Sequence, residues 1–153
     1  MGWPKADGSQ CPACGRRAII VTCDPIDQTV VGREYRVEGF TYNRCAACGE
    51  AYYAAGQIDD ILRAANAAAR LDLGRLSGDD VATIRRGLGL TQAQLGARLG
   101  VSTGLVTRWE RGTVLPGAMA DRYLRDLAAH PELVGEGALV ARESRGPYRP
   151  RSR

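Results

Sequence analysis

The chain has 153 residues with an apolar content of 44%, enough for one folded domain or two small ones. No stretch approaches the roughly 18 consecutive apolar residues that cross a bilayer, and no signal-peptide core is visible, so we expect a cytoplasmic protein without a membrane segment. The net charge of +4 favours an acidic partner, although residues 135–153 carry much of the excess, with five basic and two acidic side chains.

Residues 1–56 contain two cysteine pairs with metal-ligand spacing, CPAC at 11–14 and CAAC at 45–48, each followed by glycine. Two such turns close a tetrahedron of thiolates, which is the ligand set of structural zinc sites. We therefore predict one structural Zn²⁺ held by Cys11, Cys14, Cys45 and Cys48. Four cysteine ligands leave no open position for a catalytic water. An iron site of the rubredoxin type and a pair of disulfides are the alternatives.

Strand-like runs lie between the two pairs, at 18–23, 29–37 and 40–44, with Gly39 at a break. This layout predicts a small zinc-ribbon-like β domain over 1–56, which is too poor in apolar residues to fold without its metal. Cys23 shares a strand face with Ile19 and Val21, so we expect it to be buried, with a redox role as the alternative. The charged and aromatic residues of these strands predict solvated faces with cross-strand ion pairs, or alternatively a protein-binding surface.

Residues 57–76 predict a connector helix from about Gln57 to Leu71, because Ile58, Ile61, Leu62 and Ala65 follow helical spacing. Gly74 and the Ser77-Gly78 pair then mark a break, which is a candidate hinge before the next domain.

Residues 77–134 predict an all-α domain. Ser77 caps a helix that runs to about Arg86, and a later helix opens at Leu115-Pro116 and ends before Pro131. That later helix has an expected apolar face made of Met119, Tyr123, Leu124 and Leu127.

Two short helices at the centre of this domain form the run TQAQLGARLGVSTGLVTRWERG, residues 91–112. Thr91 and Gln94 match a capping box, Gly100 is a helix stop, and Ser102 caps the second helix. An ordinary helical hairpin is the alternative to a helix-turn-helix. The outward side of the second helix is small, polar and basic, which suits a DNA major groove.

The residues expected to touch DNA share an exposed position on these two helices or their caps: Gln92, Ser102, Thr103, Gly104, Thr107, Arg108 and Arg111. Arg108 is the candidate for bidentate contact with a guanine edge, and a phosphate contact or a surface ion pair is its alternative role. Gln92, Ser102 and Thr103 could bind phosphates.

The central run resembles the helix-turn-helix of the Xre/Cro-like DNA-binding proteins, except that Gly96 stands where that family usually has alanine. The paired cysteines, the connector, this motif and the closing LRDLAAHPEL at 124–133 together resemble the MqsA (YgiT-type) antitoxins. The resemblance implies a homodimer that binds a palindromic operator, partly through Arg108, and represses its own operon. It also implies that the zinc domain neutralises a toxin, commonly a ribonuclease.

The predicted fold class is therefore α+β, with a zinc-ribbon-like β domain, a connector helix, an Xre-type helix-turn-helix domain and a disordered basic tail at 135–153. A stand-alone zinc-containing regulator without a toxin, and a metal or redox protein using Cys14 or Cys23, are the alternative functions. No paired carboxylates, activated nucleophile or phosphate-binding glycine loop is visible, so we expect no enzyme.

Overall fold

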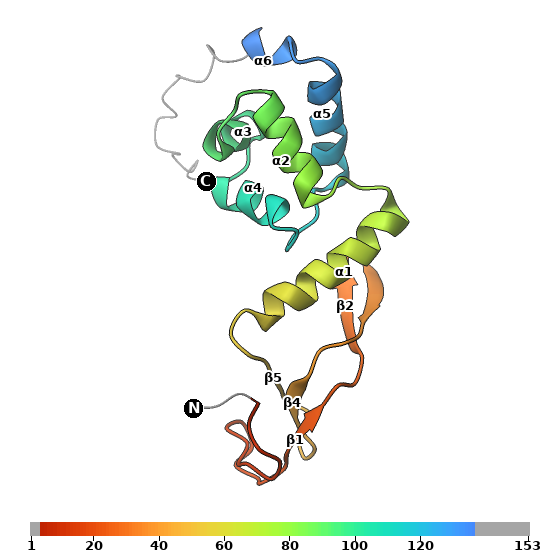
Figure 1. Cartoon of the computed structure of the whole chain (residues 1–153), viewed down its shortest axis with the longest axis vertical. Helices are drawn as coiled ribbons and strands as arrows, with labels where there is room; N and C mark the ends of the chain where they lie inside the picture. Colours follow the sequence, from red (N-terminus) through yellow and green to blue (C-terminus); the bar gives the residue numbers. More distant parts are fainter. Residues whose placement is uncertain (1–3, 137–153) are drawn as a thin grey trace, which may run out of the picture.

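The computed structural model describes residues 4–136, which form an elongated molecule with a β region at one end and a helical bundle at the other (Figure 1). Within these residues, none of the helices is both long enough and apolar enough to cross a membrane. The predicted α+β class is confirmed. Of the predicted basic tail, residues 137–153 lie outside the described part of the chain.

The β region contains a three-stranded antiparallel sheet with strand order β1-β4-β5, formed by β1 (Ile19–Thr22), β4 (Tyr42–Cys45) and β5 (Ala51–Tyr52). The N-terminal segment covers the free edge of β1, where the Val21 amide donates to the Asp7 carboxylate at 2.7 Å. The fully buried Asn43 of β4 ties the same segment down, because its side chain accepts from the Lys5 amide and donates to the Lys5 carbonyl. The sheet therefore presents no free edge at β1.

A separate hairpin is formed by β2 (Ile26–Val30) and β3 (Arg33–Val37), which pair from Ile26–Val37 to Val30–Arg33. The predicted continuous run over 29–37 is therefore wrong, because a two-residue turn at Val31-Gly32 divides it. Both turn residues have positive φ, 51° at Val31 and 76° at Gly32, as a type I′ turn requires. Gly32 suits this turn, but valine at the first position is a poor turn former, because a left-handed backbone costs a residue with a Cβ about 1–2 kcal/mol.

Helix α1 (Gln57–Leu73) ends at the left-handed Gly74 and packs on the hairpin through Ala65 and Ala69, which contact Val30 and Val37. The opposite end of the molecule also contacts α1, since the Asn66 side chain donates to the Gly112 carbonyl at 3.0 Å. The expected hinge after α1 is held by tertiary contacts: Leu76 is buried in the helical core, and its amide donates to the Asp121 carboxylate at 2.6 Å. The connector is therefore packed against both halves.

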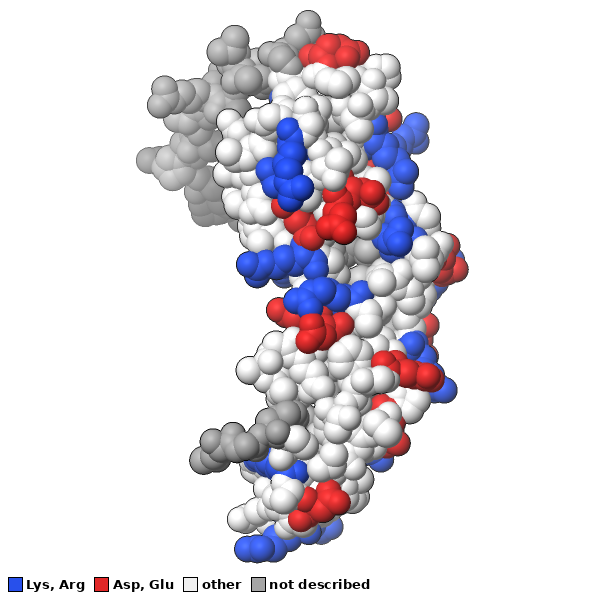
Figure 2. All heavy atoms as spheres, viewed as in Figure 1, with Lys and Arg blue, Asp and Glu red and all other residues white. Residues whose placement is uncertain are grey.

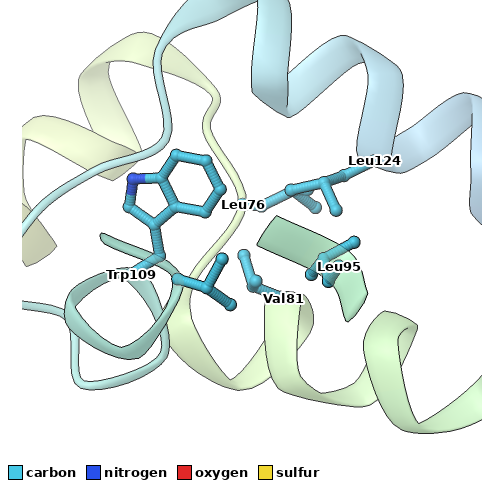
Figure 3. Packing of buried hydrophobic residues seen from close by; sticks show 6 residues of the cluster. Leu76, Val81, Leu95, Trp109 and Leu124 are labelled. Carbon is cyan, nitrogen blue, oxygen red and sulfur yellow. The ribbon is translucent and has the colours of Figure 1, made fainter. Parts of the chain in front are cut away.

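The helical bundle consists of α2 (Gly78–Gly87), α3 (Gln92–Leu99), α4 (Thr103–Glu110), α5 (Ala118–Ala129) and the short α6 (Leu133–Glu136). Ser77 and Thr91 form the predicted N-terminal caps of α2 and α3, both as capping boxes. The core is small and apolar, and Leu76, Val81, Leu95, Trp109 and Leu124 converge in it from four helices and the segment before α2 (Figure 3). It buries one face of each of the helices α2 to α5.

Three burial predictions are wrong. Cys23 is exposed, because β1 ends at Thr22 and the chain leaves the sheet there. Met119 and Tyr123 are 84% and 39% exposed, because the buried stripe of α5 consists of Asp121, Leu124 and Leu127. Asp121 is the polar member of this stripe. Its carboxylate accepts hydrogen bonds from the Leu76 amide and from Arg125.

Candidate metal centre and nucleic-acid interface

The four predicted cysteine ligands meet at the tip of the β region. All four Sγ atoms lie within 4.8 Å of one another, with 3.8 Å between Cys11 and Cys48 and 3.7 Å between Cys14 and Cys45. A zinc–sulfur bond of about 2.3 Å in a tetrahedron gives sulfur–sulfur edges of about 3.8 Å. These distances are well beyond the roughly 2.05 Å of a disulfide. The donor set therefore fits one tetrahedral metal ion.

Local backbone geometry builds each half of this cluster. Gly15 and Gly49 follow the two CxxC turns with φ of 74° and 79°, and their amides donate to the carbonyls of Cys11 and Cys45 at 2.9 and 2.8 Å. A residue with a side chain is disfavoured at such φ, so glycine permits each turn to close. Each turn therefore carries one buried thiol, on Cys11 or Cys45, and one exposed thiol.

Tyr52 of β5 is a neighbour of the cluster that sequence reasoning missed. Its hydroxyl lies 3.1 Å from Cys11 Sγ, and this hydrogen bond lowers the pKa of the Cys11 thiol to about 6. The backbone amide of Glu50 acts to lower the pKa of Cys48, but burial and the three neighbouring thiols raise it to about 12. Four thiolates this close together repel one another. A bound metal cation would compensate their negative charge.

The helix-turn-helix is formed by α3 and α4. A Cβ on Gly96 would lie 2.9 Å from the Val101 carbonyl oxygen, so glycine allows α3 to approach the turn closely. Gly100 ends α3 with φ of 69°, and the Ser102 hydroxyl accepts from the Leu105 amide at 3.2 Å to cap α4. The predicted caps are thus present, and they fix the start of α4 relative to α3.

The structure divides the expected DNA-contacting residues into two groups. The exposed group lies on α4 and its two ends: Ser102, Thr103, Gly104, Arg108 and Arg111. Gln92 and Thr107 form the second group, half-buried and bonded to each other, with the Thr107 hydroxyl donating to Gln92 Oε1 at 2.9 Å. The amide of Gln92 is therefore committed within the protein.

Gln92 and Thr107 belong to a larger polar network that joins α2, α3 and α4. Gln92 Nε2 donates to Glu110 Oε2 at 2.8 Å, and Arg85 of α2 donates to both carboxylate oxygens of Glu110. Burial acts to raise the pKa of Glu110, but the hydrogen bonds from Arg85 and Gln92 lower it below its usual value. Arg85 lies 25 residues from Glu110, so sequence spacing alone did not identify it as the partner.

The charge pattern of the face shown in Figure 2 is mixed. Figure 2 shows basic and acidic side chains interspersed along the visible face of both the helical bundle and the β region. The face seen in this view is therefore not a strongly basic one.

The fold and the site together define a protein that joins a four-cysteine metal centre to a helix-turn-helix bundle. The family model of MqsA, the antitoxin component of a bacterial toxin–antitoxin system, matches residues 9–137. Antitoxin MqsA of Escherichia coli (strain K12) is 25% identical over 128 residues, covering 83% of this chain and 98% of that protein. The chain belongs to the MqsA antitoxin family, which confirms the resemblance found in the sequence.

Proposed function

We propose that this antitoxin binds a palindromic operator as a homodimer and represses its own operon, while its β region binds and neutralises the toxin, which we expect to be a ribonuclease. The observation that supports DNA binding is the exposure of Arg108 on α4, a short helix whose other exposed residues are small or polar. Membership in an antitoxin family supports a regulator rather than an enzyme.

Arg108 is proposed to read a guanine edge in the major groove, where a guanidinium makes two parallel hydrogen bonds. Ser102 and Thr103 at the start of α4, with Gly104 allowing close approach and Arg111 at its end, are proposed to contact the backbone. The network through Gln92, Thr107 and Glu110 holds α4 in place, so we assign Gln92 and Thr107 a positioning role, with a phosphate contact for Gln92 only if its amide is released.

The metal is proposed to be structural Zn²⁺, held by Cys11, Cys14, Cys45 and Cys48. When bound, it would neutralise the crowded thiolates and join the N-terminal turn to the β4–β5 turn. Such thiolates persist in a reducing compartment, which supports a cytoplasmic location. The proposed divisions are a metal-binding part at 1–56, a connector at 57–76, the helix-turn-helix part at 77–134 and a basic tail at 135–153.

The test combines the purified protein with the purified product of the adjacent reading frame and with promoter DNA of the same operon. We expect a dimer by light scattering, a stable complex with the adjacent gene product, loss of that product's ribonuclease activity on binding, and selective retention of the promoter fragment. Promoter binding without any interaction with the adjacent product would instead support a stand-alone regulator. Failure to bind the promoter would contradict the DNA-binding proposal.

A further inference from the structure

Tyr52 lies where the three-stranded sheet meets the metal centre. It is a residue of β5, and its ring packs against the buried cluster of Cys11, Ile19 and Cys45. Asn43 of β4 is its partner across the antiparallel ladder, so the two side chains lie on the same face of the sheet. The sheet therefore sets the position of the tyrosine ring beside the metal ligands.

The N-terminal segment also contacts this ring. Lys5 Nζ lies over the face of Tyr52, 5.5 Å from the ring centroid, which is within the range of cation–π attraction. The backbone of Lys5 is itself fixed, because Asn43 accepts from its amide at 2.7 Å and donates to its carbonyl at 3.0 Å. The ring is thus held both by Lys5 and by the core beside the metal centre.

The hydroxyl of Tyr52 reaches one of the four metal ligands. It lies 3.1 Å from Cys11 Sγ. A cysteine that binds a metal ion is a thiolate without a proton, so in the metal-bound protein this sulfur can only accept, and the tyrosine must donate. Cys11 is 1% exposed, so its sulfur has little access to water as an alternative donor.

A hydrogen-bond donor at this sulfur suits the charge of a four-cysteine site. The charges of four thiolates outnumber those of one divalent cation, so the metal centre keeps an excess of negative charge. Hydrogen bonds to the ligand atoms orient them and spread this charge, and loss of such a partner costs about 10–100-fold in metal affinity. The Tyr52 hydroxyl is placed to contribute in this way at Cys11.

We propose that Tyr52 is a positioning residue of the metal centre: its hydroxyl donates to the Cys11 thiolate, and Lys5 holds the ring in the orientation that this hydrogen bond requires. This role rests on the proposed Zn²⁺ site and goes beyond it, because it assigns metal retention to residues other than the four ligands. The consequence is tighter binding of the metal ion at the tip of the β region.

The experiment measures the zinc affinity of the full-length protein by competition with a chromophoric chelator under reducing conditions. Tyr52→Phe keeps the packed ring and removes only the hydroxyl, so its zinc dissociation constant should rise about tenfold. Tyr53→Phe removes the same group from a ring that stacks on Tyr42, outside the metal cluster, and should bind zinc as the wild type does. Lys5→Met should raise the dissociation constant by a smaller factor, with no further effect when it is combined with Tyr52→Phe.

Cobalt(II) bound in place of zinc gives a second measurement, which a change in packing alone would not move. A hydrogen bond withdraws electron density from the Cys11 sulfur. Its loss in Tyr52→Phe should therefore shift the sulfur-to-cobalt charge-transfer band to longer wavelength. Tyr53→Phe should leave the band at its wild-type position.

The outcomes separate the role of Tyr52 from the proposed metal site. If the wild-type protein does not bind zinc, both are overturned. If the wild type binds zinc and Tyr52→Phe matches it in affinity and in cobalt spectrum, only the role of Tyr52 is overturned. Equal weakening by Tyr53→Phe, or weaker zinc binding in Tyr52→Phe with an unchanged cobalt band, would also overturn it. Fully additive effects of Lys5→Met and Tyr52→Phe would overturn the role of Lys5. Weaker zinc binding together with a shifted band in Tyr52→Phe supports the proposal.

Discussion

Arg85 of α2 donates from Nε and Nη2 to the two carboxylate oxygens of Glu110 on α4, at 2.5 and 3.1 Å. The two side chains are only 14% and 11% exposed, so they interact where water screens them little. Glu110 also accepts from Gln92 of α3. One carboxylate therefore joins three helices and sets the position of α4, the helix that carries Arg108.

Replacing Glu110 with alanine should destabilise the helical bundle by about 2–4 kcal/mol, because the largely buried guanidinium of Arg85 would lose the carboxylate that compensates its charge. Urea denaturation followed by fluorescence of Trp109, in a Trp3→Phe background, would measure this change. The control is Asp27→Ala, which breaks the exposed Arg36–Asp27 pair and should have a much smaller effect. Equal effects of the two substitutions would contradict a structural role for the network.

The same network predicts acid sensitivity. The folded-state pKa of Glu110 is lowered from its usual 4.5, and that of Asp80, bonded to Ser77, is lowered from 3.8. A depressed carboxyl pKa contributes stability that is fully present above the unfolded pKa and is lost as pH falls through the folded one. The free energy of unfolding should therefore be constant just above pH 4.5 and should decline below it. Trp109 fluorescence should show a shallower decline in Glu110→Gln, and an identical decline would contradict this assignment.

Gly78 is expected to tolerate no side chain. A Cβ there would lie 2.4 Å from the Glu110 carbonyl oxygen and 2.7 Å from that of Trp109, both of them backbone atoms. Gly78→Ala should therefore cost about 1–3 kcal/mol of stability. Gly87→Ala, at the other end of α2, meets no atom within 4 Å and should be neutral or stabilising by up to about 1 kcal/mol. Thermal unfolding of the two variants would compare these effects, and a neutral Gly78→Ala would show that α2 and α4 do not pack this closely.

Removing one thiol should release the metal. Cys45→Ala should lose bound zinc and unfold residues 1–56, because metal binding of about 10–16 kcal/mol is what stabilises such a small sheet. Operator binding should remain measurable, since the helical bundle has its own core. Cys23→Ala is the control, because Cys23 is exposed and lies outside the cluster. The metal content of this variant should equal that of the wild type. Full zinc content in Cys45→Ala would refute the ligand assignment.

Arg108→Ala should weaken specific operator binding by about 1–3 kcal/mol, with a smaller change for random duplex DNA. Fluorescence anisotropy at one fixed salt concentration would measure both affinities. Arg122, an exposed arginine on α5, provides the control, and Arg122→Ala should leave both affinities unchanged. An unaltered ratio of specific to random binding in Arg108→Ala would exclude base recognition by this residue.

The sequence alone determined the features that depend on residues close together in the chain. Both CxxC pairs, the N-cap at Ser77, the capping box at Thr91 and the stop at Gly100 were predicted and are present, because each is completed within four residues. The family was also evident from the order of these motifs. The predicted motifs agree with the structure because each depends on the chemistry of neighbouring residues and not on the rest of the fold.

Only the tertiary structure decided the features that depend on distant segments. It pairs Cys11 with Cys48, joins Arg85 to Glu110, and packs α1 against both the hairpin and the helical bundle. It also exposes Met119, and it places a turn at Val31-Gly32, where valine, a poor turn former, takes the first turn position. The physical reason is the same throughout: burial and pairing are properties of the assembled surfaces, and the spacing of residues within one segment does not specify which other segment will cover it.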